Sequence, residues 1–229
     1  MPKIQTIKSR IIKKVYLTDK IFIMSLDANI DFKAGQFVNF KLSNGEQKRQ
    51  VPYTILNPPS KNNEIDFCIE LIDGGFASSI LKDVKEGDEI EIVGPFGQFT
   101  FDQTDDADEF CFIGTGTGIA PLYSMIKEYL PMISNKRFRL IFGVREKKDL
   151  IFNDELIELS KKYNNFVYVP TLTREDWDGR KGRVQQHIGD DVEGKVFYIC
   201  GIKEMVTETK EYLVKKGVKP NMIRFERYT

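Results

Sequence analysis

The sequence predicts two domains of different class: an all-β antiparallel barrel, followed by an α/β domain with a doubly wound parallel sheet. Up to Phe101, short runs alternate apolar with polar residues, and Gly, Asn or Pro separates them, which is typical of antiparallel strands. The acidic segment DQTDDAD at 102–108 interrupts this pattern. Beyond it, short apolar runs alternate with helical periods, as in a parallel sheet with crossover helices. We therefore place the domains at residues 1–102 and 103–229.

The barrel is expected from candidate strands that follow one another at short, regular spacing. The candidate strands are Thr6–Tyr16, Lys20–Leu26, Phe37–Leu42, Val51–Leu56, Glu64–Leu71, Glu89–Val93 and Gln98–Phe101.

The second domain is expected to contain strands and helices in alternation. Its candidate strands are Phe110–Ile113, Arg139–Val144, Phe166–Leu172 and Val196–Cys200. Its candidate helices present apolar faces at Ile119, Leu122, Ile126 and Leu130, at Leu156, Leu159 and Tyr163, and at Ile202, Met205, Val206, Thr209 and Leu213.

Composition and charge exclude several classes of protein. Acidic and basic residues number 34 each, so no strong field directs the chain to nucleic acid or to a membrane. No apolar run approaches the ~20 residues of a membrane span, and the first residues lack a signal-type apolar core, which predicts a cytoplasmic protein. The cysteines Cys68, Cys111 and Cys200 stand far apart in apolar runs and are expected to be buried thiols. One histidine, His187, with scattered carboxylates predicts no metal site.

The segment FIGTGTGIAPL, Phe112–Leu122, carries the sharpest chemical signal. A strand runs into glycines and directly into a helix, so backbone N–H groups can approach a phosphate closely. The glycines stand at every second position, with Ile119 where the usual dinucleotide fingerprint requires the last glycine. A plain glycine turn between strand and helix remains the alternative.

Seven motifs in one order make the chain resemble the ferredoxin–NADP reductase superfamily of flavoproteins. The motifs are VPYTI (Val51–Ile55), GGFASSIL (Gly74–Leu81), GDEIEIVGPFGQF (Gly87–Phe99), GTGTGIAP (Gly114–Pro121), FGVREKKDLIFNDEL (Phe142–Leu156), YICG (Tyr198–Gly201) and the ending IRFERYT. The resemblance implies that the barrel binds FAD, rather than FMN, and that the α/β domain binds NADPH or NADH.

The resemblance also implies roles for residues of the barrel. Tyr53 would lie flat on the flavin ring, and Thr54 would hydrogen-bond near its reactive nitrogen; an aromatic face and a hydroxyl suit these contacts. Backbone groups of Ile69, Glu70 and Leu71 would edge the flavin. The flavin phosphates would be held by Gly75, Phe76, Ala77 and Ser78.

One position departs from the family's pattern. The family has an arginine two residues before the tyrosine, where this chain has Val51. Arg49 lies two residues further upstream and faces the same side of a regular strand. It could replace the missing arginine by reaching, or through a bulge in the strand, and a weakly held flavin is one possible outcome.

In the second domain the resemblance assigns the nicotinamide site. The glycine loop would hold the dinucleotide through Gly114, Thr115, Gly116, Thr117, Gly118 and Pro121. Cys200 and Gly201 would lie beside the nicotinamide, followed by Met205. Glu226 and Tyr228 belong to the tail, whose aromatic ring can cover a flavin face in the family; a frayed tail is the alternative.

Choice of nicotinamide depends on groups near the adenosine ribose, because arginine favours a 2′-phosphate. The candidates are Arg145, Thr173, Arg174 and Arg180, and they favour NADPH over NADH. A solvated basic loop would have the same composition.

The resemblance implies a flavin-dependent oxidoreductase that transfers a hydride between NAD(P)H and bound FAD, then electrons to ferredoxin or flavodoxin. Three alternatives stay open: a reductase of free flavin, an electron-transfer subunit of a larger complex, and a non-catalytic relic. We expect a monomer. The basic residues Lys8, Arg10, Lys13 and Lys14 could dock an acidic protein partner, or simply solvate a strand.

Overall fold

The computed structural model describes residues 3–61 and 63–228. Two compact units divide the chain: one comprises the residues up to Phe101 together with Tyr123–Glu128, and the other Asp102–Leu122 together with the residues from Tyr129. The change of unit at Phe101 lies at the start of the acidic segment, whose residues 102–108 lie outside helices and strands.

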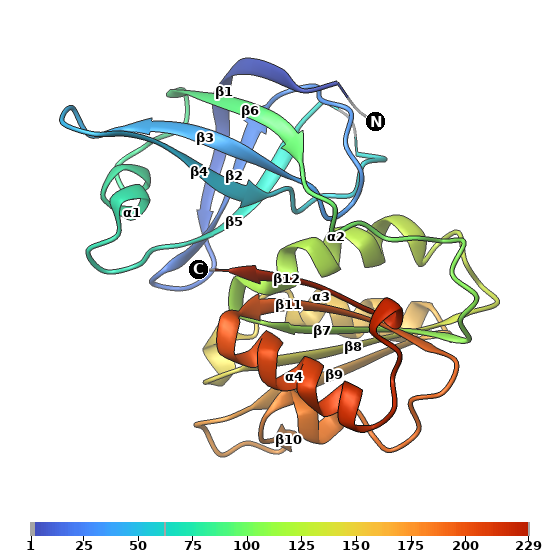
Figure 1. Cartoon of the computed structure of the whole chain (residues 1–229). Helices are drawn as coiled ribbons and strands as arrows, with labels where there is room; N and C mark the ends of the chain where they lie inside the picture. The colour runs from blue at the N-terminus through green and yellow to red at the C-terminus, as the bar shows by residue number, and fades with distance from the viewer. Residues whose placement is uncertain (1–2, 62, 229) are drawn as a thin grey trace. The chain divides into compact units, whose positions relative to one another are not determined.

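The first unit is built on an antiparallel sheet (Figure 1) in the order β4-β3-β6-β1-β2-β5. Its strands are β1 (Gln5–Tyr16), β2 (Ile21–Asp27), β3 (Phe37–Ser43), β4 (Lys48–Thr54), β5 (Ile65–Glu70) and β6 (Glu89–Phe96). An isolated antiparallel bridge between Ile55 and Phe67 joins the two edge strands, which closes the sheet on itself. The predicted antiparallel barrel is therefore confirmed, and its interior is filled by Phe22, Met24, Leu26, Val38, Phe40 and Phe67.

A bulge in β1 changes which side chains face the barrel interior. Ile11 pairs with Leu26, but after a register shift Lys14 pairs with Met24 and Tyr16 with Phe22. Because paired residues of antiparallel strands point to the same face, the extra residue turns Lys14 toward the interior side. Strict alternation from Ile11 would have pointed Lys14 to solvent.

The prediction of a strand at Gln98–Phe101 is wrong. β6 ends at Phe96, and Gly97 has a φ of +106°, a conformation that ends the regular strand. Phe99 and Phe101 are both buried in an irregular segment. Their alternation with polar residues thus reflects burial of two rings without strand pairing.

The second unit contains a parallel sheet in the order β10-β9-β8-β7-β11-β12 (Figure 1). The elements are β7 (Glu109–Thr115), α2 (Ile119–Tyr129), β8 (Arg137–Val144), α3 (Asn153–Lys162), β9 (Phe166–Leu172), β10 (Arg180–Lys181), β11 (Lys195–Ile202), α4 (Lys203–Lys215) and β12 (Ile223–Tyr228). The register of β7, β8, β9 and β11 is unbroken. All four strands and three helices expected here are present.

Both faces of this sheet are covered, as a doubly wound sheet requires. Cys111, Ile113, Phe197 and Ile199 share one buried cluster with α4 residues such as Val206. The alternate residues face the other side, where Phe112 stacks on Phe138 and Tyr198 with ring centroids 5.8 and 5.3 Å away. The doubly wound prediction is confirmed.

The last strand was not predicted from the sequence. β12 pairs in parallel with β11 from Ile223 opposite Phe197 to Tyr228 opposite Ile202, so the end of the chain as far as Tyr228 is part of the sheet and not frayed. Within the described residues, no helix combines the length and the apolar character needed to cross a membrane.

Candidate functional site

The end of β4 presents an aromatic ring and a hydroxyl in sequence. Tyr53 is half-buried, and its ring centroid lies 4.5 Å from that of Phe40 in the barrel core. Burial raises the pKa of Tyr53 to about 12, so the phenol stays neutral at physiological pH. Thr54 is buried and pairs across the strand with Phe37. Tyr53 and Thr54 are therefore the last residues of β4, and the Tyr53 ring is partly accessible to a ligand.

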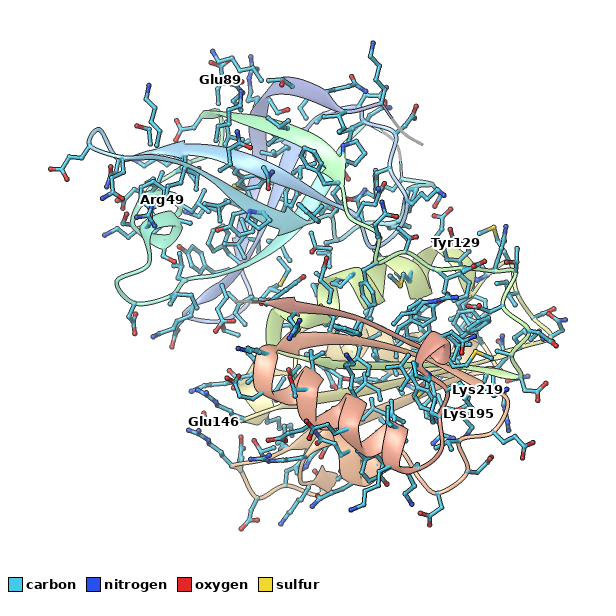
Figure 2. The ribbon with its side chains drawn as sticks, viewed as in Figure 1. Arg49, Glu89, Tyr129, Glu146, Lys195 and Lys219 are labelled. Carbon is cyan, nitrogen blue, oxygen red and sulfur yellow. The ribbon has the colours of Figure 1, made fainter. Side chains whose placement is uncertain are left out.

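Arg49 lies beside α1 (Phe76–Leu81), as Figure 2 shows. Its guanidinium carbon is 4.7 Å from the centroid of the Phe76 ring, and one nitrogen donates a hydrogen bond of 2.6 Å to Gln47 Oε1. The described pairing of β3 with β4 runs from Leu42 opposite Arg49 to Val38 opposite Tyr53 without a register shift. The bulge considered for this strand is therefore not there, and Arg49 approaches the start of α1 by the length of its side chain.

The start of α1 combines a tight turn with a half-buried serine. Gly74 has a φ of +73°, and Gly75 stands at the N-cap without a side-chain hydrogen bond among the described residues. Ser78 Oγ accepts a hydrogen bond of 2.8 Å from the backbone N–H of Ile72, which ties the turn together. Phe76, Ala77 and Ser78 are each half-buried.

Backbone groups near the end of β5 are only partly available. Ile69 is buried, Glu70 is exposed, and β5 is an edge strand of the barrel sheet. The Leu71 N–H already donates a hydrogen bond of 2.7 Å to Lys20 O. Outward contacts from this segment must therefore come from the other backbone groups of Ile69, Glu70 and Leu71.

In the second unit, the glycine loop lies at the point where the strand order reverses. β7 leads to α2 and β11 leads to α4, and these helices cover opposite faces, so the carboxyl ends of the two strands form a topological switch point, the usual position of a nucleotide crevice. A Cβ on Gly118 would lie 2.5 Å from the carbonyl oxygen of Cys200 and 2.6 Å from Gly201 Cα. Only glycine permits this approach of the loop to the end of β11.

The same point brings Thr115, Gly201 and Met205 together. A Cβ on Gly201 would collide with Thr115 Oγ1 and would lie 2.6 Å from Met205 Cε. Thr115 Oγ1 is buried and has no hydrogen-bond partner among the described residues. A buried unpaired hydroxyl at a switch point is a group that a bound ligand could satisfy. Gly114, Gly116, Thr117 and Pro121 complete this loop.

Sequence reasoning missed the support behind Met205. Gln185 Nε2 donates a hydrogen bond of 3.1 Å to Thr209 Oγ1, which donates one of 3.5 Å to Met205 Sδ. Gln185 belongs to a short 3₁₀ turn at Val184–His187, whose packing on α4 no local pattern predicts.

Cys200, Glu226 and Tyr228 lie on one face of the sheet. Cys200 pairs with Glu226 in the β11–β12 register, and Tyr228 is two residues further along β12. The pKa of the Cys200 thiol lies well above its ordinary value, because burial and the Glu226 charge both raise it. A hydrogen bond with Tyr228 offsets only part of this rise. Burial also raises the pKa of Glu226 to about 7, and its Oε2 has no partner among the described residues. The site thus holds a carboxyl group that is poised to carry a proton near neutral pH.

Three exposed arginines lie near the carboxyl ends of the strands. Arg145 follows β8, Arg174 follows β9, and Arg180 is the first residue of β10. The backbone N–H of Arg174 donates a hydrogen bond of 3.0 Å to Arg145 O, and the backbone N–H of Thr173 donates one of 3.0 Å to Val144 O. Arg180 pairs with Thr171, and its carbonyl accepts a hydrogen bond of 2.7 Å from Trp177 Nε1. Figure 2 shows Glu146, next to Arg145, at the end of the sheet opposite Lys195. Arg145, Arg174 and Arg180 therefore share the carboxyl edge with the glycine loop.

The remaining candidates have structural partners. His187 Nε2 lies 2.9 Å from Thr171 Oγ1, and burial lowers its pKa. The three cysteines are free and buried, as predicted. Across the described ranges, no group of three or more His, Cys, Asp and Glu side chains could hold a metal ion.

Two family models match this chain in succession. Residues 10–101 match the oxidoreductase FAD-binding domain, and residues 112–211 match the oxidoreductase NAD-binding domain. Ferredoxin–NADP reductase B from Sorangium cellulosum is 34% identical over 212 residues, which are 86% of this chain and 85% of that protein. The chain belongs to the ferredoxin–NADP reductase superfamily.

Other members of the ferredoxin–NADP reductase superfamily are similar over different shares of their length. The reductase component of phenol 2-monooxygenase from Pseudomonas sp. (strain CF600) is 33% identical over 215 residues, 90% of this chain but 60% of that protein. A ferredoxin–NADP reductase from Neisseria gonorrhoeae, solved with bound FAD and NADP, has the same fold, with a TM-score of 0.86, 24% identity, and coverage of 97% of this chain and 98% of that chain. The chain described here thus combines an oxidoreductase FAD-binding domain with an oxidoreductase NAD-binding domain.

Proposed function

We propose that this chain transfers a hydride between NAD(P)H and FAD bound to the barrel, and passes the electrons to ferredoxin or flavodoxin. The observation that carries the proposal is the switch point of the second unit, where the glycine loop approaches the end of β11 closely and the buried Thr115 hydroxyl has no hydrogen-bond partner among the described residues. Bound FAD would supply an acceptor that takes a hydride and returns electrons one at a time.

In this proposal the barrel holds the flavin by three groups of contacts. Tyr53 stacks on the ring system, and the adjacent Thr54 supplies a hydroxyl. The turn from Gly75 to Ser78 faces the phosphates, with Arg49 in place of the arginine absent at Val51. The 4.7 Å contact of Arg49 with the Phe76 ring supports this replacement, because it places the guanidinium at the start of α1.

The second unit would hold the nicotinamide dinucleotide. The loop from Gly114 to Gly118 would present backbone N–H groups to phosphate, and Cys200 with Gly201 would lie beside the nicotinamide, where small residues suit the close approach of a ring. Glu226 holds a proton at its carboxyl near neutral pH, since its pKa is raised to about 7. Arg145, Arg174 and Arg180 would bind a 2′-phosphate, which makes NADPH the preferred nucleotide.

An anaerobic absorption spectrum tests the proposal first. Purified chain with FAD or FMN should show a bound-flavin spectrum that bleaches when NADPH is added, more slowly with NADH. Failure to bind any flavin, or a bound flavin that neither nucleotide reduces, would overturn the proposal and favour the relic.

A second candidate is an electron-transfer component of an oxygenase. The similarity to the phenol 2-monooxygenase reductase component favours it, and this chain spans 60% of that protein. Steady-state reduction separates the candidates: direct reduction of added ferredoxin or flavodoxin supports the first, and saturable reduction of free FMN supports a flavin reductase. Reduction of ferricyanide with neither of these acceptors reduced points to a missing partner component.

A further inference from the structure

Lys14 makes contacts that set it apart from the other basic residues of β1. Its Nζ donates hydrogen bonds of 2.9 Å to Leu81 O, 2.7 Å to Lys82 O and 2.9 Å to Val84 O. An ammonium group has three N–H donors, so all three are used. The acceptors belong to the last residue of α1 and the turn that follows it.

The β1 bulge directs Lys14 to this position. β1 pairs with β6 only as far as Arg10. Further along, the same edge of β1 runs beside the segment that follows α1, and the backbone N–H of Lys14 donates a hydrogen bond of 3.1 Å to Glu86 Oε1. The Lys14 ammonium also lies 4.8 Å from the centroid of the Phe22 ring inside the barrel. Backbone and side chain of Lys14 thus both bind the 81–86 segment.

The electrostatics of this arrangement favour a fixed α1. The last carbonyl groups of a helix carry partial negative charge and lack intrahelical partners. A short helix such as α1, of six residues, has little stability of its own. Its position must therefore come from tertiary contacts, among them the packing of Leu81 in the barrel core and the hydrogen bonds of the Lys14 ammonium.

We propose that Lys14 is a positioning residue for flavin binding, because its ammonium fixes α1 and so places the turn from Gly75 to Ser78 against the flavin phosphates. The inference rests on the proposed function. Lys14 acts through α1 and touches no cofactor itself, and it no longer belongs to the set of lysines that could dock a protein partner.

Lys14→Met tests the inference, because it keeps the aliphatic stem and removes the charge. Binding of FAD, FMN and riboflavin is measured by quenching of flavin fluorescence. We expect FAD and FMN to bind about tenfold more weakly and riboflavin, which lacks phosphate, to change less than twofold. The matched control Lys13→Met, on the exposed side of the same strand, should leave all three affinities unchanged.

The ratio of FAD affinity to riboflavin affinity is the decisive readout, because a general loss of structure would weaken the binding of both flavins alike. An unchanged FAD affinity in Lys14→Met, or an equal loss for FAD and riboflavin, would overturn the inference. If Lys14→Met does not fold, Lys14→Arg takes its place: the charge remains but the planar guanidinium cannot meet three carbonyls in the same way, and FAD should weaken about threefold with riboflavin unchanged.

Hydrogen exchange separates this inference from the proposed function. Amides of α1 should exchange faster in Lys14→Met than in wild type or Lys13→Met, with no flavin added. If the wild-type protein binds no flavin, both the proposed function and the role of Lys14 in positioning the phosphate-binding turn are overturned. Unchanged exchange in α1, with flavin binding intact, would overturn the positioning role alone.

Discussion

At the residue scale, Glu226 is the group whose ionisation is most disturbed by its position. Its pKa is raised by burial from an ordinary 4.5 to about 7, so the folded state keeps the proton over a range in which the unfolded state loses it. The protein should lose stability as pH rises through this window, by on the order of 3 kcal/mol at most. Thermal unfolding midpoints at pH 5 and pH 8 measure this loss.

Glu226→Gln is the matched variant for this prediction, because the amide is neutral at every pH. Its midpoint should fall less between pH 5 and pH 8 than the wild-type midpoint. Equal pH dependence in the two proteins would show that the carboxyl is not buried in its protonated form.

Arg174 decides, in our proposal, between the two nicotinamide nucleotides. Loss of one charged contact to a phosphate corresponds to roughly 1.4 kcal/mol, or about tenfold in affinity. Arg174→Ala should therefore raise the KM for NADPH about tenfold and leave the KM for NADH within twofold. Lys215→Ala, at an exposed position on α4, is the control, and an equal rise for both nucleotides in Arg174→Ala would contradict the assignment.

At the element scale, the glycine loop can be tested by two substitutions with different physical costs. Gly118→Ala places a Cβ 2.5 Å from the Cys200 carbonyl oxygen, and such overpacking typically costs about 1–3 kcal/mol. Gly116→Ala meets no atom within 4 Å, and only its φ of +55° opposes it, which costs roughly 1–2 kcal/mol. Since the Gly118 clash must move the loop away from β11, we expect a larger increase in KM for NAD(P)H in Gly118→Ala.

Urea unfolding and steady-state kinetics of both glycine variants measure this difference. The prediction does not survive if Gly116→Ala impairs nucleotide binding more than Gly118→Ala does.

The elements also show what local sequence can predict. Strands β7, β8, β9 and β11 were recognised because each is a nearly continuous apolar run, as expected for strands buried on both faces. β12 was not, because IRFERY is an edge strand with only Ile223 fully buried, and its pairing with β11 is a tertiary contact. Gln98–Phe101 failed in the opposite sense, since two buried rings imitated strand alternation.

The role of Lys14 depends on a register shift that the pattern only hints at. The adjacent Ile11 and Ile12 break the alternation of β1, and this pair was the one available sign of the bulge. The carbonyl groups that Lys14 binds belong to α1 and the turn after it, far away in the sequence: Lys14 and Val84 are 70 residues apart. By contrast, the residues of the glycine loop could be named in advance because they are contiguous.

At the scale of the whole molecule, charge is balanced, so docking of an acidic partner must depend on a local patch. Two of the four basic residues of β1 are engaged: Lys8 pairs with Glu89, and Lys14 binds the last residue of α1. Arg10 and Lys13 remain as exposed candidates. A patch of this size should act mainly on the association rate and be weakened by salt.

Lys13→Glu should lower kcat/KM for ferredoxin or flavodoxin several-fold at low ionic strength, and the deficit should shrink as salt is added. Lys219→Glu is the matched control: it makes the same change in net charge, at an exposed position of the second unit that Figure 2 labels. Reduction of ferricyanide reports the nucleotide and flavin steps without a docked protein and should be unchanged in both variants. If both charge reversals slow the protein acceptor equally, net charge governs the encounter and β1 is not the docking surface. If only Lys13→Glu does so, the acceptor approaches the barrel near β1.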